Sequence, residues 1–472
     1  MPHEELTHAT LPRMASPLVD RKLELSRLRE AIEHPPQLVL LRGRRRIGKS
    51  FLLVHALGRG RGVFFQADEQ NERAHLDLLA REVGHLLGPR VPLHFDSWDQ
   101  ALETIGELAR EKPLAVVLDE FQWMKAAQPS LDSIVQRHWD RWQRERTPVT
   151  LILSGSALRL MEELLEPGAP LYGRVDYRPL LAPLDFRDAS LFASGGLSAE
   201  AKLRRYAVLG GTPQYQVWAG PGRLRGLIAK RILAKGESLY EEPLHLLREE
   251  QEIRDPATYF AIVRAIAAGS TRVSEISNAV RVPVPNLVKM LNRLEALGYL
   301  DARSPLSAKG FEARRTSYRL ADPFFRFWFR FLFPNRSLLE RGRVGEVMRI
   351  VERDMDTYMG LAFEDCCREW AGRHAADALP ASQQLGSWWS RDGRAEVDVV
   401  GVSRGRYDLL GSCKWSGAAP ASALEQLLAQ RDALPRAGSA QLAIFARGFS
   451  AALERQAEEE GVTLIGIDRL FA

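Results

Sequence analysis

Eight consecutive residues near the amino terminus have the types and the spacing needed to hold a phosphate group. Glycines at both ends of a short turn let the backbone fold around an anion, and the helix that follows points its free N–H groups at that anion. The pattern G-x-x-x-x-G-K-[ST] describes this arrangement, which is called a P-loop. The residues that match it are Gly43, Arg44, Arg45, Arg46, Ile47, Gly48, Lys49 and Ser50.

The chemistry expected of this loop is the binding of a nucleoside triphosphate together with a magnesium ion. Lys49 would reach the β- and γ-phosphates, and the Ser50 hydroxyl would ligate Mg²⁺. We add Phe51, the next residue, to the predicted nucleotide-binding segment. The loop therefore predicts ATP as ligand and Mg²⁺ as cofactor. The arginines fill its variable positions, where they could face phosphate, a neighbouring acid or solvent.

An apolar run that ends in two acids supplies the second part of this chemistry. Mg²⁺ and the attacking water need carboxylates near the γ-phosphate, and residues 114–120 read LAVVLDE. We predict that Asp119 holds Mg²⁺ through its water shell and that Glu120 polarises the hydrolytic water. A third apolar run, 149–157, ends in hydroxyl residues that could sense the γ-phosphate, although an ordinary strand end would look the same. The candidates there are Ser154 and Ser156.

Alternating strand and helix patterns indicate the elements that must position these motifs. Apolar strand patterns at 38–41, 62–68, 114–120 and 149–157 alternate with helical ones, which predicts a parallel sheet covered on both faces. We therefore expect an α/β P-loop NTPase core over residues 1–190 and a helical lid over 191–255. In the lid, a Gly-Gly-Thr-Pro turn at 210–213 ends one helix and begins the next with proline in its first turn.

Residues 256–322 predict a separate small domain with the order of a winged helix-turn-helix. Three helical patterns are followed by two strand patterns around a basic loop. The third helix would enter a DNA major groove and the loop would touch phosphates, or the whole domain could serve as an intramolecular packing module. The helix residues are Asn286, Lys289 and Arg293, and the loop residues are Lys309, Arg314 and Arg315. The run DPFFRFWFRFLF (322–333) is too short to span a membrane, and we expect a mostly buried helix there, within a helical connector over 323–350.

The last 120 residues or so raise a different chemistry, that of metal-assisted phosphodiester cleavage. Two strand patterns, 395–402 and 406–416, follow a helical one. Alternation along the strands puts Glu396 and Asp398 on one face and Lys414 on the matching face of the partner strand. Carboxylates can hold Mg²⁺ while a lysine orients or activates water. A charged, solvent-facing hairpin would show the same residues.

Composition bounds the class of protein around these motifs. The chain has 472 residues, 45% of them hydrophobic, and a net charge of +5, which suits about three domains and permits contact with nucleic acid without requiring it. Three cysteines give neither a disulfide framework nor a zinc spacing. The first residues lack the apolar core of a signal peptide, and no apolar run approaches 18 residues. We expect a soluble, cytoplasmic protein without a membrane partner.

Taken together, the motifs resemble a known group of proteins. GRRRIGKS, VVLDEFQWM, LSGS, PLYGR, GGTPQY and YRLADPFFRFWFRF resemble archaeal-type P-loop ATPases of the STAND/AAA-related group. In these, a winged helix precedes a carboxy-terminal domain of unknown function similar to PD-(D/E)XK nucleases, which have a restriction-endonuclease-like α/β fold. The resemblance implies that Arg174 is an arginine sensor or finger and that Arg21 lies beside the adenine. For the nuclease-like domain, residues 351–472, it implies a site of Glu364, Asp398 and Lys414.

One departure from the nuclease pattern matters. The pattern has an acid two residues before the lysine, but this chain has Ser412, and a serine adds no charge to a metal site. Glu396 is the nearest carboxylate that could replace the missing one. We therefore predict a nucleotide-driven ATPase switch with a nuclease-like domain retained for binding or scaffolding, with DNA, a second copy or another protein as possible partner. The alternatives are an ATP-regulated DNA nuclease that uses Asp398 and Lys414, and a non-enzymatic ATP-gated binding module.

Overall fold

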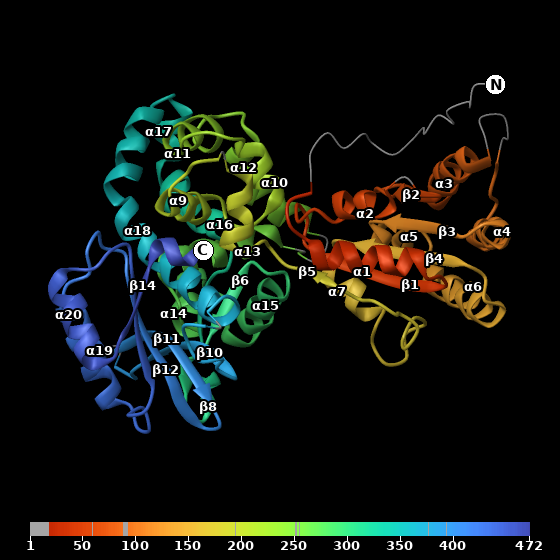
Figure 1. Cartoon of the computed structure of the whole chain (residues 1–472). Coiled ribbons are helices and arrows are strands. Elements are labelled where there is room, and N and C mark those ends of the chain that lie inside the picture. Colours follow the sequence, from red (N-terminus) through yellow and green to blue (C-terminus); the bar gives the residue numbers. More distant parts are fainter. Residues whose placement is uncertain are drawn as a thin grey trace, which may run out of the picture. The chain divides into compact units, whose positions relative to one another are not determined.

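The structure is a computed structural model, and it describes residues 18–472 except 59, 88–92, 194, 251–252, 254, 376 and 393. The chain divides into two compact units, Met1–Ala182 and Pro183–Ala472, which Figure 1 colours from red to yellow and from yellow to blue. Each unit is described by itself. The ATPase core was predicted to span residues 1–190, and its first 17 residues lie outside the described residues.

A five-stranded parallel sheet organises the amino-terminal unit. The strand order is β2-β3-β4-β1-β5, so β4 lies between the strand before the P-loop and the strand that ends in Asp119. This confirms the predicted parallel α/β core. The strands are β1 (Gln37–Gly43), β2 (Gly62–Gln66), β3 (Leu114–Asp119), β4 (Val149–Gly155) and β5 (Leu180–Leu181).

Helices cover both faces of this sheet, and β1 shows why its sequence is continuously apolar. Leu38 and Leu40 belong to the hydrophobic core on one face, whereas Val39 and Leu41 belong to the core on the other. A strand buried on both faces has no polar alternation. The helices of the unit are α1 (Lys22–Glu33), α2 (Lys49–Leu57), α3 (Glu72–Leu87), α4 (Trp98–Glu111), α5 (Phe121–Ala127), α6 (Leu131–Glu145) and α7 (Leu158–Glu163).

The carboxy-terminal unit begins with short helices, most of which lie in the segment 191–255 that the sequence assigned to a helical lid. They are α8 (Phe186–Ala189), η1 (Ser190–Phe192), α9 (Ala199–Leu209), α10 (Pro213–Ala219), α11 (Leu224–Leu227), η2 (Ile228–Ile232) and α12 (Ser238–Glu249). The Gly-Gly-Thr-Pro turn separates α9 from α10, and Pro213 occupies the first turn of α10. Gly211 has no room for a side chain, because a Cβ atom there would lie 1.8 Å from the backbone oxygen of Leu184.

Three helices and a strand pair follow in the order predicted for 256–322. They are α13 (Pro256–Ala267), α14 (Val273–Val280), α15 (Val284–Ala296), β6 (Leu300–Arg303) and β9 (Ser317–Leu320), with β6 antiparallel to β9. Asn286 and Lys289 of α15 are exposed, and Arg293 is half-buried. Between β6 and β9 lie a small hairpin, β7 (Leu306–Ser307) and β8 (Gly310–Phe311), and the 3₁₀ turn η3 (Ala313–Arg315).

This hairpin packs against the last sheet of the unit instead of projecting into solvent. Leu306 is fully buried in the core that underlies that sheet. Arg315 ion-pairs with Glu312 at 2.9 Å and donates a hydrogen bond to the backbone oxygen of Trp389. Of the three loop cations that the sequence assigned to phosphate contact, Lys309 and Arg314 remain exposed, but Arg315 is engaged within the unit.

The aromatic run 322–333 is buried, as predicted. Its aromatic side chains and Leu332 belong to the largest hydrophobic core of the unit or pack against it. The segment consists of α16 (Pro323–Phe327), the π-helical turn η4 (Trp328–Leu332) and η5 (Phe333–Asn335), followed by α17 (Arg336–Glu340) and the 30-residue helix α18 (Val344–Arg373). Helix α18 runs unbroken through the boundary predicted between the connector, 323–350, and the nuclease-like domain, 351–472. None of the helices in the described part of the chain is long and apolar enough to cross a membrane.

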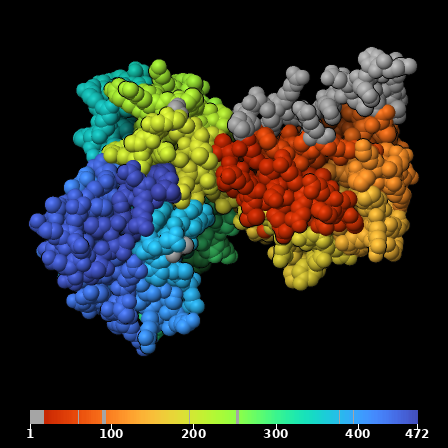
Figure 2. Space-filling model, viewed as in Figure 1, coloured from red at the N-terminus to blue at the C-terminus, as the bar shows by residue number. Residues whose placement is uncertain are grey.

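A mixed five-stranded sheet ends the chain, with α18 on one face and two helices on the other. The order is β10-β11-β12-β13-β14, with antiparallel pairs up to β12 and parallel pairs beyond it. Helices α19 and α20 form the outer surface of this layer (Figures 1 and 2). The elements are β10 (Gln384–Trp389), β11 (Glu396–Ser403), β12 (Arg406–Lys414), α19 (Ser422–Ala433), β13 (Gln441–Ala446), α20 (Ala451–Glu460), β14 (Thr463–Gly466) and η6 (Ile467–Leu470).

The close approach at Gly211 yields a stability prediction. Gly211→Ala should destabilise the carboxy-terminal unit by about 3 kcal/mol, because the backbone at Leu184 must move to admit a methyl group. Gly226→Ala is the matched control: a Cβ atom there meets nothing within 4 Å, so its effect should stay below about 1 kcal/mol. Scanning calorimetry of both variants measures the difference, and equal unfolding temperatures would contradict the packing described here.

Candidate functional site

The P-loop turn has the backbone shape that its glycines predict. Gly48 has φ 91° and precedes α2, and Arg46 also lies in the left-handed region with φ 70°. At Gly43, a Cβ atom would lie 2.9 Å from the Cγ2 atom of Ile47, a buried side chain. A side chain at position 43 would therefore press on the loop, and the sequence uses glycine there.

Lys49 is buried inside this loop and is held by it. Its Nζ atom donates to the backbone oxygens of Gly43 at 3.0 Å and of Arg44 at 3.3 Å, and it lies 3.8 Å from the Oε1 atom of Glu120. Phe51 is half-buried on α2, and its ring centroid lies 4.4 Å from that of His55. The loop thus brings a desolvated ammonium group to the carboxyl end of β3.

The two acids at the carboxyl end of β3, Asp119 as its last residue and Glu120 directly after it, occupy different surroundings. Asp119 is fully buried, and its Oδ2 atom accepts a hydrogen bond of 2.5 Å from the Ser50 hydroxyl. Burial, followed by the charge of Glu120, raises the pKa of Asp119. Burial would also raise the pKa of Glu120, but Lys49, hydrogen bonds from two neighbours and the nearby Arg45 outweigh it and hold that pKa below its ordinary value. The site therefore keeps Glu120 ionised.

Ser156 and Gln122 fix the position of the Glu120 carboxylate. The Ser156 hydroxyl donates to Glu120 Oε2 at 2.6 Å, and the Gln122 amide donates to Glu120 and, at 3.1 Å, to Ser156. Ser154 is buried beside Asp119 instead. Sequence reasoning missed Gln122. The one sequence feature that could have indicated it is its position two residues after Glu120, in the first turn of α5. Glu120 itself has φ 55°, a left-handed conformation that turns the chain sharply into α5.

Two arginines assigned through the family resemblance have protein partners. Arg174 forms a two-pronged ion pair with Asp140 of α6, at 2.6 Å and 2.9 Å. Arg21 is buried before α1 and donates to the backbone oxygen of Ala182 at 2.5 Å. Their roles at the phosphate and at the adenine stay predictions.

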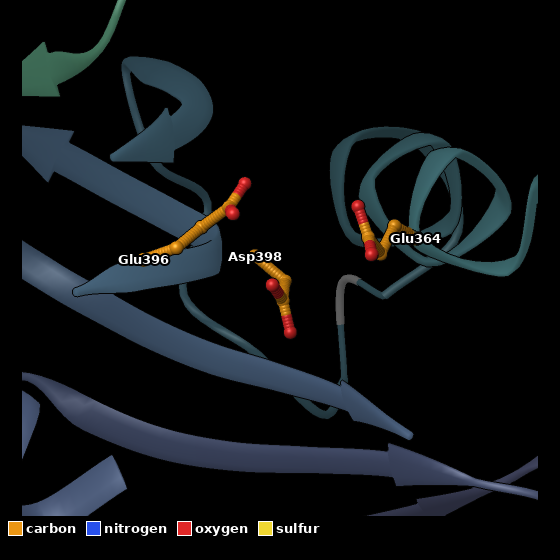
Figure 3. A group of neighbouring side chains, drawn as sticks. All are labelled: Glu364, Glu396 and Asp398. Atoms are coloured by element: carbon orange, nitrogen blue, oxygen red, sulfur yellow. The ribbon is translucent and has the colours of Figure 1, made fainter. Parts of the chain in front are cut away.

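The carboxy-terminal unit brings three carboxylates together. Glu364 comes from α18, and Glu396 and Asp398 come from β11; one oxygen of each lies within 4.8 Å of the others (Figure 3). Side chains two residues apart on a strand share a face, and α18 packs against that face. We call Glu364, Glu396 and Asp398 the carboxylate triad.

The proximity of these acids changes the protonation of Glu364. Burial, followed by the charge of Asp398, raises the pKa of Glu364 to about 8. Burial also raises the pKa of Asp398, although a hydrogen bond of 2.7 Å from the Cys413 N–H and the nearby Lys414 oppose this. At neutral pH the triad therefore carries a proton, which a cation would have to displace. Carboxylate oxygens are the ligands that Mg²⁺ and Ca²⁺ prefer, and ligand atoms around Mg²⁺ lie roughly 3 to 4 Å apart. Small movements of the three side chains would therefore bring their oxygens to the spacing that a bound Mg²⁺ needs.

Two further residues shape this site. Ser412 stands next to Asp398 on the neighbouring strand, with its hydroxyl 3.5 Å from the carboxylate. Arg368, one turn after Glu364 on α18, donates to the backbone oxygen of Asp398 at 2.6 Å and lies 3.9 Å from the Glu364 carboxylate. Sequence reasoning missed Arg368; its spacing of four residues from Glu364 places both on one helix face.

Two family models match two different segments of the chain. Residues 18–217 match a family described as an ATPase domain predominantly from Archaea. Residues 328–426, which include the carboxylate triad, match a second family described as archaeal and bacterial proteins of unknown function. Together with the P-loop geometry, the first match defines the class of this protein, which is a P-loop ATPase; its residues 18–217 are similar to an ATPase domain found predominantly in Archaea.

Individual proteins resemble the chain over most of its length. An uncharacterized protein of Methanocaldococcus jannaschii is 26% identical over 395 residues, which are 82% of this chain and 84% of that protein. The Walker-type ATPase PABY2304 of Pyrococcus abyssi has a similar fold, with a TM-score of 0.50, 23% identity and coverage of 66% of this chain and 96% of that one. The ORC2 protein of Aeropyrum pernix aligns with a TM-score of 0.44 and 15% identity, over 74% of this chain and 98% of that one.

The raised pKa of Glu364 predicts a pH-dependent stability effect. In the folded protein this pKa is about 8, against an ordinary value of 4.5, so the unfolded chain loses the proton first as the pH rises. The resulting cost to folding is absent below pH 4.5 and grows until pH 8. Glu364→Gln removes it and, without metal, should raise the free energy of unfolding on the order of 2 to 4 kcal/mol at pH 8.

Chemical denaturation at pH 5 and pH 8 in a chelating buffer measures this effect. The difference between variant and wild type should be several times larger at pH 8. Glu425→Gln, which changes an exposed glutamate of α19, serves as control and should show no such trend. A Glu364→Gln difference that is the same at both pH values would contradict the protonated triad.

Proposed function

We propose that this ATPase couples ATP hydrolysis to a divalent-cation site in its carboxy-terminal unit that cleaves phosphodiester bonds of nucleic acid. One observation carries the second half of this proposal: three carboxylates from α18 and β11 converge to within 4.8 Å. The proposal keeps the predicted α/β restriction-endonuclease-like architecture for residues 351–472, where the mixed sheet lies between α18 on one face and α19 with α20 on the other.

For ATP hydrolysis, we assign a role to each residue at the carboxyl end of β1 and β3. Lys49, now held by loop carbonyls, would turn to the β- and γ-phosphates. Ser50 and Asp119, which hydrogen-bond to each other, would together hold Mg²⁺. Glu120 would accept the proton of the attacking water, since its lowered pKa keeps it ionised. Ser156 would report the γ-phosphate through its hydrogen bond to Glu120.

For phosphodiester cleavage, the triad would hold the metal and Lys414 would orient the nucleophile. A bound divalent cation supplies Lewis-acid activation of the phosphate and lowers the pKa of a coordinated water. Glu396 would provide the carboxylate that Ser412 does not, because it lies on the same face of β11 as Asp398. Lys414 is near enough to Asp398 to lower the pKa of that carboxyl. At this distance from the proposed metal site, a lysine can help to align a water molecule.

The three helices and strand pair of residues 256–320 support contact with nucleic acid mainly through α15. We interpret them as a winged helix whose α15 presents the exposed Asn286 and Lys289 to a major groove. The β7–β8 hairpin packs on the last sheet, and Arg315 hydrogen-bonds to Trp389. We therefore assign the loop between β6 and β9 a smaller role in phosphate contact than the sequence indicates.

A second candidate is a nucleotide-driven switch that binds nucleic acid without cutting it. Ser412 in place of an acid and the Arg368 guanidinium 3.9 Å from Glu364 favour it, because both reduce the negative charge that a metal needs. In this alternative, ATP binding and hydrolysis would change only the population of a binding-competent state.

Two substitutions test the ATPase assignments. Lys49→Ala should lose ATP binding, because the phosphates lose their buried cation. Glu120→Gln should keep ATP binding and lower turnover by about 100-fold or more, since the general base is removed. Nucleotide binding by fluorescence and phosphate release measure the two effects separately. Glu111→Gln, an exposed glutamate at the end of α4, is the control, and wild-type turnover in Glu120→Gln would refute the assignment of the base.

The cleavage proposal is tested with single- and double-stranded DNA and RNA in Mg²⁺ or Mn²⁺, with and without ATP. Wild type should produce metal-dependent fragments, and Asp398→Asn or Glu364→Gln should reduce the rate by about 100-fold or more because the metal loses a ligand.

Asp392→Asn is the matched control for this experiment, since Asp392 is an exposed acid in the β10–β11 loop that lies outside the triad. Its activity should equal that of wild type. If all substrates stay intact while ATP is hydrolysed and nucleic acid is retained, the switch without cleavage is the correct function.

A further inference from the structure

The two carboxylate oxygens of Glu120 have different partners. Oε2 accepts hydrogen bonds from the Ser156 hydroxyl, at 2.6 Å, and from the side-chain amide of Gln122. Oε1 lies 3.8 Å from the Nζ atom of Lys49. A carboxylate oxygen has about two lone-pair sites, so these two donors occupy Oε2. Of the two oxygens, Oε1 is therefore the one that can accept a proton from water once Lys49 has turned to phosphate.

Gln122 is buried and its amide has one orientation. The residue is 1% exposed, and its nitrogen donates to Glu120 and, at 3.1 Å, to the Ser156 hydroxyl. An ionised carboxylate only accepts hydrogen bonds, so the amide must present its nitrogen to Glu120. Ser156 receives a hydrogen bond from Gln122 while it donates its own to Glu120. The three side chains thus form a closed ring of hydrogen bonds.

The amide oxygen of Gln122 lies on the other side of this ring and lacks a donor. It is buried and has no hydrogen-bond partner among the residues that the structure describes. Gly155, the last residue of β4, leaves room for it, because a Cβ atom there would lie 2.8 Å from it. A buried acceptor without a partner lowers stability, and an apolar side chain of similar size would avoid this penalty. The benefit of glutamine here therefore lies in the hydrogen bonds of its nitrogen.

We propose that Gln122 is a positioning residue for ATP hydrolysis, which holds Glu120 Oε2 together with Ser156 so that Oε1 points to the attacking water. The inference rests on the proposed role of Glu120 as the general base. In that step the water oxygen bonds to the γ-phosphorus and one water proton moves to Oε1. The bond from the γ-phosphorus to the bridging oxygen breaks and leaves its electron pair on ADP.

Lys49 explains why the carboxylate needs a second anchor. Its ammonium group lies beside Oε1, and the phosphates of ATP would attract the same group because they carry more negative charge than one carboxylate. When Lys49 turns to the phosphates, Oε1 loses its cation and becomes available to water. Gln122 and Ser156 still hold Oε2 at that moment, so the carboxylate keeps its position. Loss of such fixed geometry typically lowers a rate by about tenfold to 100-fold.

The test compares Gln122→Met with Gln143→Met in the full chain. Methionine has a similar size and no donor, and Gln143 is an exposed glutamine of α6. At saturating ATP, Gln122→Met should lower kcat by about tenfold or more. It should change the KM for ATP by less than about threefold, because it removes no contact to the nucleotide. The unfolding temperature should stay within about 5 °C of wild type, and Gln143→Met should match wild type in all three measurements.

A second background separates positioning from a purely structural role. In Glu120→Gln, the added Gln122→Met change should cause no further loss of the residual turnover, because Gln122 acts through a carboxylate that is already gone. A structural role would lower turnover again by a similar factor, as independent effects do. If Gln122→Met does not fold, Gln122→Asn takes its place; it keeps a buried amide, is one methylene shorter, and should lower kcat in the same way.

Three results would overturn this inference. They are a wild-type kcat in Gln122→Met, a raised KM with unchanged kcat, and an equal further loss in the Glu120→Gln background. In each of these cases Glu120 remains the proposed base, because Glu120→Gln by itself tests that role. Failure of the positioning role is therefore distinguishable from failure of the proposed ATPase mechanism.

Discussion

The carboxy-terminal unit depends on the ion-pair cluster around one carboxylate, that of Asp365. Its arginine partners come from β6, β9, α16 and α18, so one acid ties the strand pair, the aromatic core segment and the long helix to one another. A buried carboxylate with a single partner would be costly, and several charge-assisted hydrogen bonds are what make its burial tolerable. The Arg326 and Arg303 charges accordingly hold the pKa of Asp365 below its usual range, against the effect of burial.

This cluster decides where the proposed chemistry takes place. With Asp365 fixed, the residue before it on α18, Glu364, is held against β11 and meets Glu396 and Asp398. Burial and, after it, repulsion from the Asp398 charge raise the pKa of Glu364 to about 8. Such stored repulsion is typical of a site that a cation relieves. The positive cluster and the negative triad are thus neighbouring, opposite charges, bridged by Arg368.

In the ATPase unit, the residues of the candidate site lie in a few short sequence segments. Its loop, helix start and strand ends are short contiguous segments, and parallel strands bring their carboxyl ends to one edge of the sheet. The Ser50 to Asp119 hydrogen bond joins two residues far apart in sequence, yet both follow from strand ends that the apolar runs already mark. The nucleotide site and the carboxylate triad therefore reach their geometry in different ways.

The sequence by itself determined strands β1 to β4 of the ATPase core, the P-loop and the two acids at the end of β3, because backbone geometry and burial pattern are local properties; it did not indicate the short strand β5. It also indicated Glu364, Asp398 and Lys414 through resemblance to a family pattern, and Glu396 through strand alternation with Asp398. Only the tertiary structure decided that Glu364 of α18 comes within 4.8 Å of Glu396 and Asp398, that α18 is one continuous helix, that the β7–β8 hairpin packs on the last sheet and that Arg174 pairs with Asp140. The arginines around Asp365 look like ordinary surface charges in the sequence. Their role arises from contacts between residues up to 62 positions apart, and the energy of such contacts depends on burial and distance, which no local pattern encodes.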